Sequence, residues 1–295
     1  MKLSETKKKN SVKIARDGEF ESLGFVTHSN PNQLVYLEDA KYVSKMLKKS
    51  NISSVITTEE LVSSLPKELG IGVSINPRKS FYEIHNHLAK DTVFYWTPFK
   101  TEISSNAKIH PTAYIAERNV RIGEGCEICP NVSILKNTIL ERDVIVRTGS
   151  VIGAEGFEFN RIGKKVLHVA HAGGVLINSR VEIQANCCID KAVFNGFTEI
   201  GEDTKLDNLI HVAHNVVIGK RCLLAANAMV AGSVIIGNDV WIGPSATISS
   251  EILIGDGASI TIGSVVVRDV ASGQRVTGNF AIDHKSFISF LRKIR

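Results

Sequence analysis

Aliphatic residues recur at every sixth position through the second half of this chain. From Ile200 to Val266 the period holds without a miss, and glycine follows many of these positions directly. Neither a helix nor a single strand has a period of six, but the coils of a parallel β-helix do, with three hexapeptides per coil and the aliphatic side chain inward. The pattern predicts a triangular prism. Its inward positions are Ile200, Leu206, Val212, Ile218, Leu224, Val230, Ile236, Ile242, Ile248, Ile254, Ile260 and Val266.

The same period occurs upstream, from Ile122 to Ile152, and resumes at Ile177. Between these stretches residues 153–176 break the phase, which predicts an excursion from the coil, and loops that leave a regular scaffold often form sites. Cys126, Cys187 and Cys222 each fall four places after an inward residue. That position favours core packing over a metal or redox role for the cysteines.

Residues 1–100 do not keep the period and are typical of a small α/β domain. We expect short strands and turns first, then a helix near residues 40–50 with Tyr42, Met46 and Leu47 on its inner face. Two strand-then-helix segments follow. In the second, Asn76 or the proline after it begins a helix that spans residues 78–90.

The predicted fold is therefore mainly β. A small α/β domain (1–100) precedes a β-helix (101–278), and a short amphipathic C-terminal helix (279–295) follows, with Phe287, Phe290 and Leu291 on one face. The net charge of +5 is modest, and much of the visible excess lies at the two ends. No nucleic-acid-binding motif accompanies it. The chain has no secretory signal and no membrane-spanning apolar run, so we expect a cytoplasmic protein with free thiols.

The tetrapeptide HVAH occurs twice, at residues 168–171 in the excursion and at 211–214 inside the repeat. His214 lies two places after the inward Val212, which predicts a corner of the prism held by neighbouring coils. Gly232 lies eighteen residues, or one full coil, beyond His214. The period therefore predicts that the two share one side of the prism, one layer apart.

A small α/β domain, a hexapeptide prism and the strings KLDNLIHVAHNVVIG (205–219) and MVAGSVIIG (229–237) together resemble the UDP-3-O-acylglucosamine N-acyltransferase family of lipid A biosynthesis. The resemblance implies a left-handed parallel β-helix and a homotrimer with active sites between subunits. It also implies that acyl carrier protein donates a 3-hydroxyacyl chain to the 2-amine of a UDP-amino sugar, without a further cofactor.

The resemblance also implies roles for individual residues. His214 would be the general base that takes a proton from the attacking amine, and histidine suits this task because it titrates near neutral pH. The backbone amide of Gly232 would stabilise the oxyanion. Asp207 is a candidate to orient or polarise the base, or a turn residue. Asn208 and Asn215 belong to the same matching motifs and are candidate substrate contacts.

Further residues are candidates for substrate binding. Tyr36 and Tyr42 have the spacing of two family aromatics that stack on uracil, although both could instead be core. His211 is either a hydrogen-bonding partner of the substrate or an exposed neighbour. Glu251 stands where the family often has a second histidine, so a contact to the substrate or acyl donor is expected to differ.

Three alternatives stay open. A sugar-nucleotide N-acetyltransferase that uses acetyl-CoA, for O-antigen or capsule amino sugars, would need the same fold and base. A zinc-dependent carbonic anhydrase would need three histidines; the repeat offers only His211 and His214, so a third ligand would have to come from the excursion, and no metal site is predicted. A non-catalytic scaffold would leave the spacing of His214 and Gly232 as a coincidence.

Overall fold

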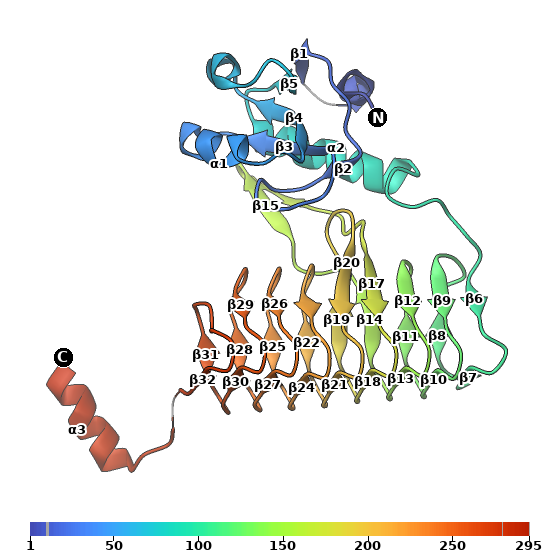
Figure 1. The fold of residues 1–295 in the computed structure, drawn as a ribbon, viewed down its shortest axis with the longest axis vertical. Helices are drawn as coiled ribbons and strands as arrows, with labels where there is room; N and C mark the ends of the chain where they lie inside the picture. The colour runs from blue at the N-terminus through green and yellow to red at the C-terminus, as the bar shows by residue number, and fades with distance from the viewer. Residues whose placement is uncertain (10–11, 279, 295) are drawn as a thin grey trace.

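The computed structural model describes residues 1–9, 12–278 and 280–294. A three-sided prism of parallel strands forms one layer, and a smaller α/β unit lies over one side of it, as Figure 1 shows. The C-terminal helix α3 (His284–Ile294) stands away from the last coils. None of the helices in the described ranges is both long and apolar enough to cross a membrane.

The α/β unit contains a five-stranded sheet in the order β1-β5-β4-β3-β2. All neighbours pair in parallel except β1 and β5, which are antiparallel. The strands are β1 (Lys13–Arg16), β2 (Ser22–Leu23), β3 (Gln33–Leu37), β4 (Ile52–Thr57) and β5 (Gly70–Val73). The helices are η1 (Leu3–Lys9), η2 (Ala40–Tyr42), α1 (Val43–Leu47), η3 (Glu59–Ser64) and α2 (Pro77–Asp91).

Helix α2 begins as the sequence predicted. The side chain of Asn76 accepts a hydrogen bond from the backbone N–H of Lys79 at 2.9 Å, and proline follows in the first turn. The expected inner face of the earlier helix was wrong. Met46 is buried, but Tyr42 and Leu47 are 47% and 50% exposed. Tyr42 belongs to a 3₁₀ turn, whose three residues per turn rotate it away from the face that a regular α-helix would give it.

The prism consists of three parallel sheets, and each coil contributes one strand to each sheet. The first contains β7 (Lys108–Ile109), β10 (Glu127–Ile128), β13 (Ile145–Val146), β18 (Glu182–Ile183), β21 (Lys205–Leu206), β24 (Leu223–Leu224), β27 (Trp241–Ile242), β30 (Ser259–Ile260) and β32 (Arg275–Val276). The second contains β8 (Tyr114–Ile115), β11 (Ser133–Ile134), β14 (Val151–Ala154), β19 (Cys188–Asp190), β22 (His211–Val212), β25 (Met229–Val230), β28 (Thr247–Ile248) and β31 (Val265–Val266). The third contains β6 (Glu102–Ile103), β9 (Val120–Ile122), β12 (Thr138–Leu140), β17 (Gly174–Ile177), β20 (Phe197–Ile200), β23 (Val217–Ile218), β26 (Ile235–Ile236) and β29 (Leu253–Ile254).

The six-residue period determines which side chains point into the core. The inward aliphatic residues and the three cysteines placed behind them are buried in one continuous cluster, as predicted. The third residue after most inward positions has a left-handed backbone, for example Asn215 at φ 60° and Asn227 at φ 60°. Asparagine, aspartate and glycine tolerate this conformation best, which explains why they recur at the corners.

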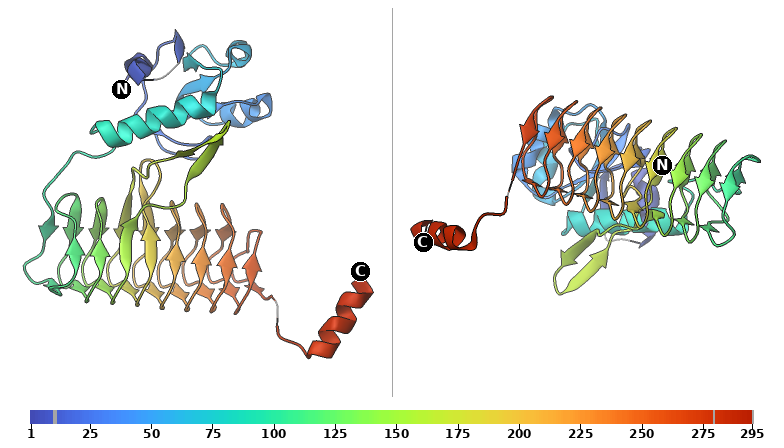
Figure 2. Two further views of the ribbon diagram at one scale, coloured as in Figure 1. Left: turned by 180° about the vertical axis from the view of Figure 1, so that it is seen from behind. Right: turned by 90° about the horizontal axis from the view of Figure 1, so that it is seen from below.

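The predicted excursion is a hairpin that rises from the prism toward the α/β unit. It comprises β15 (Phe159–Ile162) and β16 (Lys165–His168), paired antiparallel, and Figure 2 shows it projecting beneath α2. Asn86 of α2 accepts from the Ala170 N–H and donates to the His168 carbonyl, each at 2.8 Å. Phe194, from a later turn of the prism, is buried in the same apolar cluster as Phe81 of α2. These contacts fix the end of the hairpin against both parts of the molecule.

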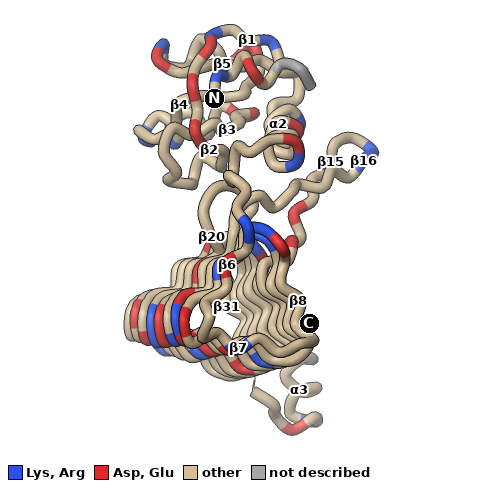
Figure 3. Tube along the Cα trace, turned by 90° about the vertical axis from the view of Figure 1, so that its right-hand side faces the viewer, with Lys and Arg blue, Asp and Glu red and all other residues tan. Residues whose placement is uncertain are grey.

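Charged side chains stack along one edge of the prism. Figure 3 shows basic and acidic residues alternating from coil to coil there. Arg180 pairs with Asp203 of the next coil at 2.8 Å, and Arg221, one coil beyond Asp203, pairs with Asp239 at 2.6 Å. These pairs join consecutive coils at a solvated edge, where water screens them and they add little stability.

Candidate active site

His214 lies at a corner between β22 and β23, partly exposed, and the next coil covers its ring. A Cβ added to Gly232 would lie 2.6 Å from Cε1 and 2.8 Å from Nε2 of His214. The Ser233 N–H also donates to the His214 carbonyl at 2.9 Å. The predicted stacking of the two residues, one coil apart on the same side, is therefore confirmed. Only a residue without a side chain fits at position 232 while the ring stays in place.

Asn215 fixes the other side of this ring. Its Oδ1 accepts a hydrogen bond from the Val193 N–H at 3.0 Å and lies 3.3 Å from Nδ1 of His214. An N–H on Nδ1 can donate to this oxygen, which would leave the lone pair of Nε2 free to accept a proton. Position 215 has a left-handed backbone, which suits asparagine, so Asn215 both forms the corner and orients the imidazole.

The excursion brings the first HVAH copy beside the second. The ring centroids of His171 and His214 are 5.5 Å apart. Glu158, which precedes β15, places Oε2 3.8 Å from Nε2 of His214. The sequence predicted that the first HVAH copy lies in a loop and the second at a rigid corner, and the fold packs His171 of the first against His214 of the second. Glu158 and His171 were not predicted as site residues, and the repeated tetrapeptide was the signal that pointed to one of them.

Burial keeps the neighbouring histidines neutral. It lowers the pKa of His171 to about 3, with the positive charge that His214 can carry as the next cause. Burial also lowers the pKa of His28 to about 4, again with His214 contributing. Both rings therefore resist protonation in the folded chain.

Asp190 and Cys188 on β19 face His211 across one coil. Nε2 of His211 lies 3.6 Å from Asp190 Oδ2, and the Cys188 thiol lies 3.7 Å from Oδ1. Burial raises the pKa of Asp190, although the charge on His211 opposes this shift. Burial and the nearby carboxylate raise the pKa of Cys188 to about 11, so the thiol stays protonated. His211 thus lies beside the site, half exposed.

Asp207 occupies a different corner of the coil from His214. Its carboxylate accepts hydrogen bonds from the backbone N–H of Asn208 at 2.7 Å and of Ala226 at 3.1 Å. Asn208 in turn accepts from the Ala185 N–H at 3.1 Å. Within one chain Asp207 therefore stabilises a turn and does not contact His214, because consecutive corners point to different edges of the prism. A role for Asp207 beside the base would require a neighbouring subunit.

Two adjoining cavities extend from the α/β unit to the surface of the prism beside Asn215. The first, about 530 Å³, is lined by Tyr36, Tyr42 and Arg78. The second, about 510 Å³, is lined by Asn215 and Ser233, the residues that follow His214 and Gly232. Glu251 lines both and thus lies at their junction.

The two tyrosines differ in their surroundings. Tyr36 packs against Phe81 with ring centroids 5.2 Å apart, and Arg78 lies 5.8 Å over its ring. Tyr42 is largely exposed. Tyr36 is therefore both core and cavity wall, whereas the exposed ring of Tyr42 has the Lys41 ammonium 4.9 Å from its centroid.

Comparisons with known proteins agree with this architecture. The family described as bacterial transferase hexapeptide (six repeats) matches residues 119–154 and 197–232. A UDP-3-O-acylglucosamine N-acyltransferase of Helicobacter pylori is 33% identical over 255 residues, covering 77% of this chain and 73% of that protein. UDP-3-O-acylglucosamine N-acyltransferase 2 of Legionella pneumophila is 35% identical over 309 residues, covering 92% and 86%.

Among solved structures, a UDP-N-acetylglucosamine acyltransferase of Francisella novicida aligns with a TM-score of 0.50 at 19% identity. The alignment covers 64% of this chain and 71% of that one. At this identity the likeness supports the fold alone.

Proposed function

The chain belongs to the family of UDP-3-O-acylglucosamine N-acyltransferases, and on this premise we propose that it transfers a 3-hydroxyacyl chain from acyl carrier protein to the 2-amine of UDP-3-O-acylglucosamine, with His214 as general base. The observation that carries the proposal is the stacking of the Gly232 backbone against the His214 ring. A base and a backbone N–H donor one coil apart can act on the attacking amine and on the thioester carbonyl oxygen of the same reaction.

The chemistry assigns each group a task. The amine nitrogen attacks the thioester carbonyl, the C–N bond forms, and Nε2 of His214 takes the proton that the amine loses. The negative charge that develops on the carbonyl oxygen is stabilised by the Gly232 N–H. When the C–S bond breaks, the proton returns from His214 to the departing thiolate. Asn215 supports this sequence because its Oδ1 lies near Nδ1 and leaves Nε2 for the substrate.

The joined cavities support the substrate assignment. A uracil ring would stack on the exposed Tyr42 face near Tyr36, and Arg78 would lie near the nucleotide. The sugar and acyl chain would then extend past Glu251 along the second cavity toward His214. We propose that Glu251 contacts the sugar or the acyl group. Where the family often has a histidine, whose ring can donate a hydrogen bond, the carboxylate of Glu251 accepts one.

A homotrimer and an acyl carrier protein partner form part of this proposal. Val217, Ile235 and Leu253 expose an apolar stripe on consecutive strands of one prism face, which a second copy of the chain would cover. Lys285, Arg292 and Lys293 make helix α3 basic, which suits an acidic carrier protein.

The test is a competition between donors and acceptors. Purified protein receives UDP-3-O-acylglucosamine together with other UDP- and dTDP-amino sugars, and either 3-hydroxyacyl carrier protein or acetyl-CoA, and mass spectrometry identifies the products. The proposal predicts transfer of the long chain to UDP-3-O-acylglucosamine, and its loss in His214→Ala. Preferred acetyl transfer to another amino sugar would favour the N-acetyltransferase alternative and overturn the proposed substrate.

A further inference from the structure

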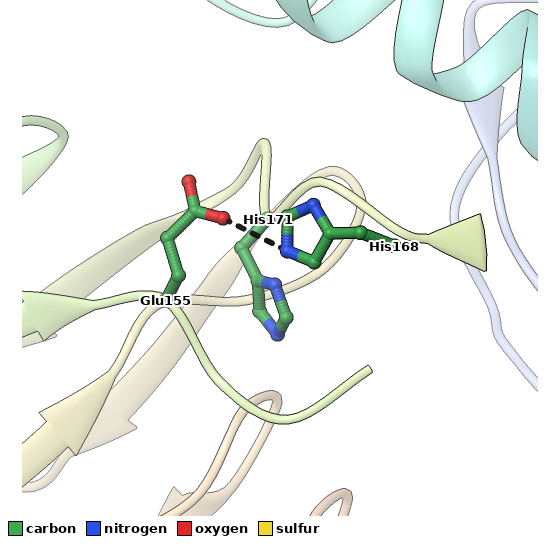
Figure 4. A group of neighbouring side chains, drawn as sticks. All are labelled: Glu155, His168 and His171. Carbon is green, nitrogen blue, oxygen red and sulfur yellow. Dashed lines mark ion pairs between the residues drawn. The ribbon is translucent and has the colours of Figure 1, made fainter. Parts of the chain in front are cut away.

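Three side chains of the excursion converge on one point. Glu155, His168 and His171 each offer a ligand atom, and all three atoms lie within 4.8 Å of one another. Nε2 of His168 lies 3.4 Å from Oε2 of Glu155. Figure 4 shows one ring nitrogen of His171 on the side of this pair, while the other points away.

His171 lacks the partners that a buried imidazole needs. Its residue is 3% exposed, and neither ring nitrogen has a hydrogen-bond partner in the described structure. A buried polar atom without a partner costs about 1–3 kcal/mol, so a group that pairs with it is expected.

The donor set specifies the kind of ligand. Two imidazole nitrogens and one carboxylate oxygen are the protein ligands of zinc sites that keep an open position, and other divalent transition ions accept them too. Calcium and magnesium prefer oxygen ligands only. His168 and Glu155 are partly exposed, so an ion has a route to the buried third ligand.

The surrounding charges are compatible with a cation. Lys191 pairs with the other oxygen of Glu155, Oε1, at 3.2 Å, and this leaves Oε2 toward His168. The lysine repels a cation but also orients the carboxylate, as hydrogen-bonded neighbours of metal ligands commonly do. Asp190 adds negative charge nearby: its Oδ2 and the His171 Nε2 both lie within 3 Å of the place where a Gly156 Cβ would be.

We propose that Glu155, His168 and His171 bind a divalent transition-metal ion of the zinc type. The inference is independent of the proposed acyl transfer. With the ion on one nitrogen of His171, the other nitrogen carries the hydrogen and points toward Asp190 and the ring of His214. The ion would thereby fix the excursion against the prism and set the orientation of His171 beside His214.

A second cluster, Cys188, Asp190 and His211, also has three candidate ligands. It is the weaker candidate because the described structure leaves none of its side-chain atoms buried without a partner, whereas both ring nitrogens of His171 lack one. This cluster provides a matched control, because it lies close by and offers the same number of ligands.

The experiment uses the full chain, treated with chelator, dialysed and titrated with Zn²⁺. Metal content is measured by mass spectrometry, and Co²⁺ absorption reports the coordination geometry. The test variants are His168→Ala and Glu155→Gln, which change partly exposed residues and spare the buried His171. His211→Ala is the control, and circular dichroism checks that each variant folds.

We expect one ion per chain in the unmodified protein, at least a 100-fold loss of affinity in both test variants, and unchanged binding in His211→Ala. Absence of stoichiometric Zn²⁺ binding by the unmodified protein would overturn the proposal. So would binding that survives His168→Ala, or that is lost in His211→Ala, since the ion would then belong to the second cluster.

Discussion

Replacing Gly232 with alanine should disable the site while leaving the fold intact. The new Cβ would lie 2.6 Å from Cε1 of His214, so the ring must move by about 1 Å to reach ordinary contact. Gly232 does not have a left-handed backbone, so alanine brings no backbone strain there. His214 has 20% of its side chain exposed and can swing outward.

The expected result is a large loss of rate with a small loss of stability. Misplacing a catalytic group by about 1 Å costs about 100-fold in rate, so kcat/KM should fall by about that factor. The displaced ring costs about 1 kcal/mol, or about 2–4 °C in Tm for a chain of this size. Steady-state kinetics with the preferred donor and thermal unfolding measure the two effects.

Two comparisons isolate the cause. Gly278→Ala is the matched control, because its new Cβ would lie 3.4 Å from the nearest atom, and it should change neither quantity. In a His214→Ala background the ring is gone, so Gly232→Ala should cause little further loss. If Gly232→Ala keeps most of its activity, or lowers the rate 100-fold again without the ring, the stacking argument is wrong.

Three further predictions concern the cavity, the corner and pH. Tyr42→Ala should raise KM for the UDP-sugar about 5- to 150-fold, the range for losing one stacked base, with Tm unchanged; equally exposed Leu47→Ala is the control, and equal KM values would refute the stacking. Asn215→Ala should lower kcat as well as Tm, whereas Asn227→Ala, which shares the left-handed backbone but not the contact with His214, should lower Tm alone; normal kcat in both would contradict the orienting role. Burial lowers the pKa values of His28 and His85 to about 4 and that of His171 to about 3, so the unfolded chain takes up protons first and the free energy of unfolding should fall as pH drops from about 6.5 to about 4. Urea unfolding at several pH values measures this, and a flat profile would contradict it.

The six-residue period predicts the prism because every coil must fill the same interior space with the same kind of side chain. Ile200, Val212 and Ile218 must point inward at fixed spacing, and an aliphatic residue is the simple solution in every coil. The contact between His214 and Gly232 follows from the same arithmetic, since one coil is eighteen residues. Both could therefore be predicted from the sequence alone.

The rest of the site depends on contacts that no period encodes. Glu158 and His171 reach His214 because the hairpin folds back between α2 and the prism, where Asn86 of α2 holds its end through two hydrogen bonds. The sequence left Asp207 either as a residue that orients the base or as a turn residue, and within one chain it is found in a turn. Asp207 precedes His214 by seven residues, and the coil turns a corner between them, so the two side chains lie at different edges of the prism.

The most direct test of the central claim compares His214→Gln with His214→Ala in single-turnover amide formation. Glutamine can still donate a hydrogen bond but cannot take a proton at neutral pH. If His214 is the general base, both variants lose about 100- to 10,000-fold in rate, with substrate affinity unchanged. If His214 only orients the substrate, His214→Gln restores most of the rate, and the account of this site is wrong.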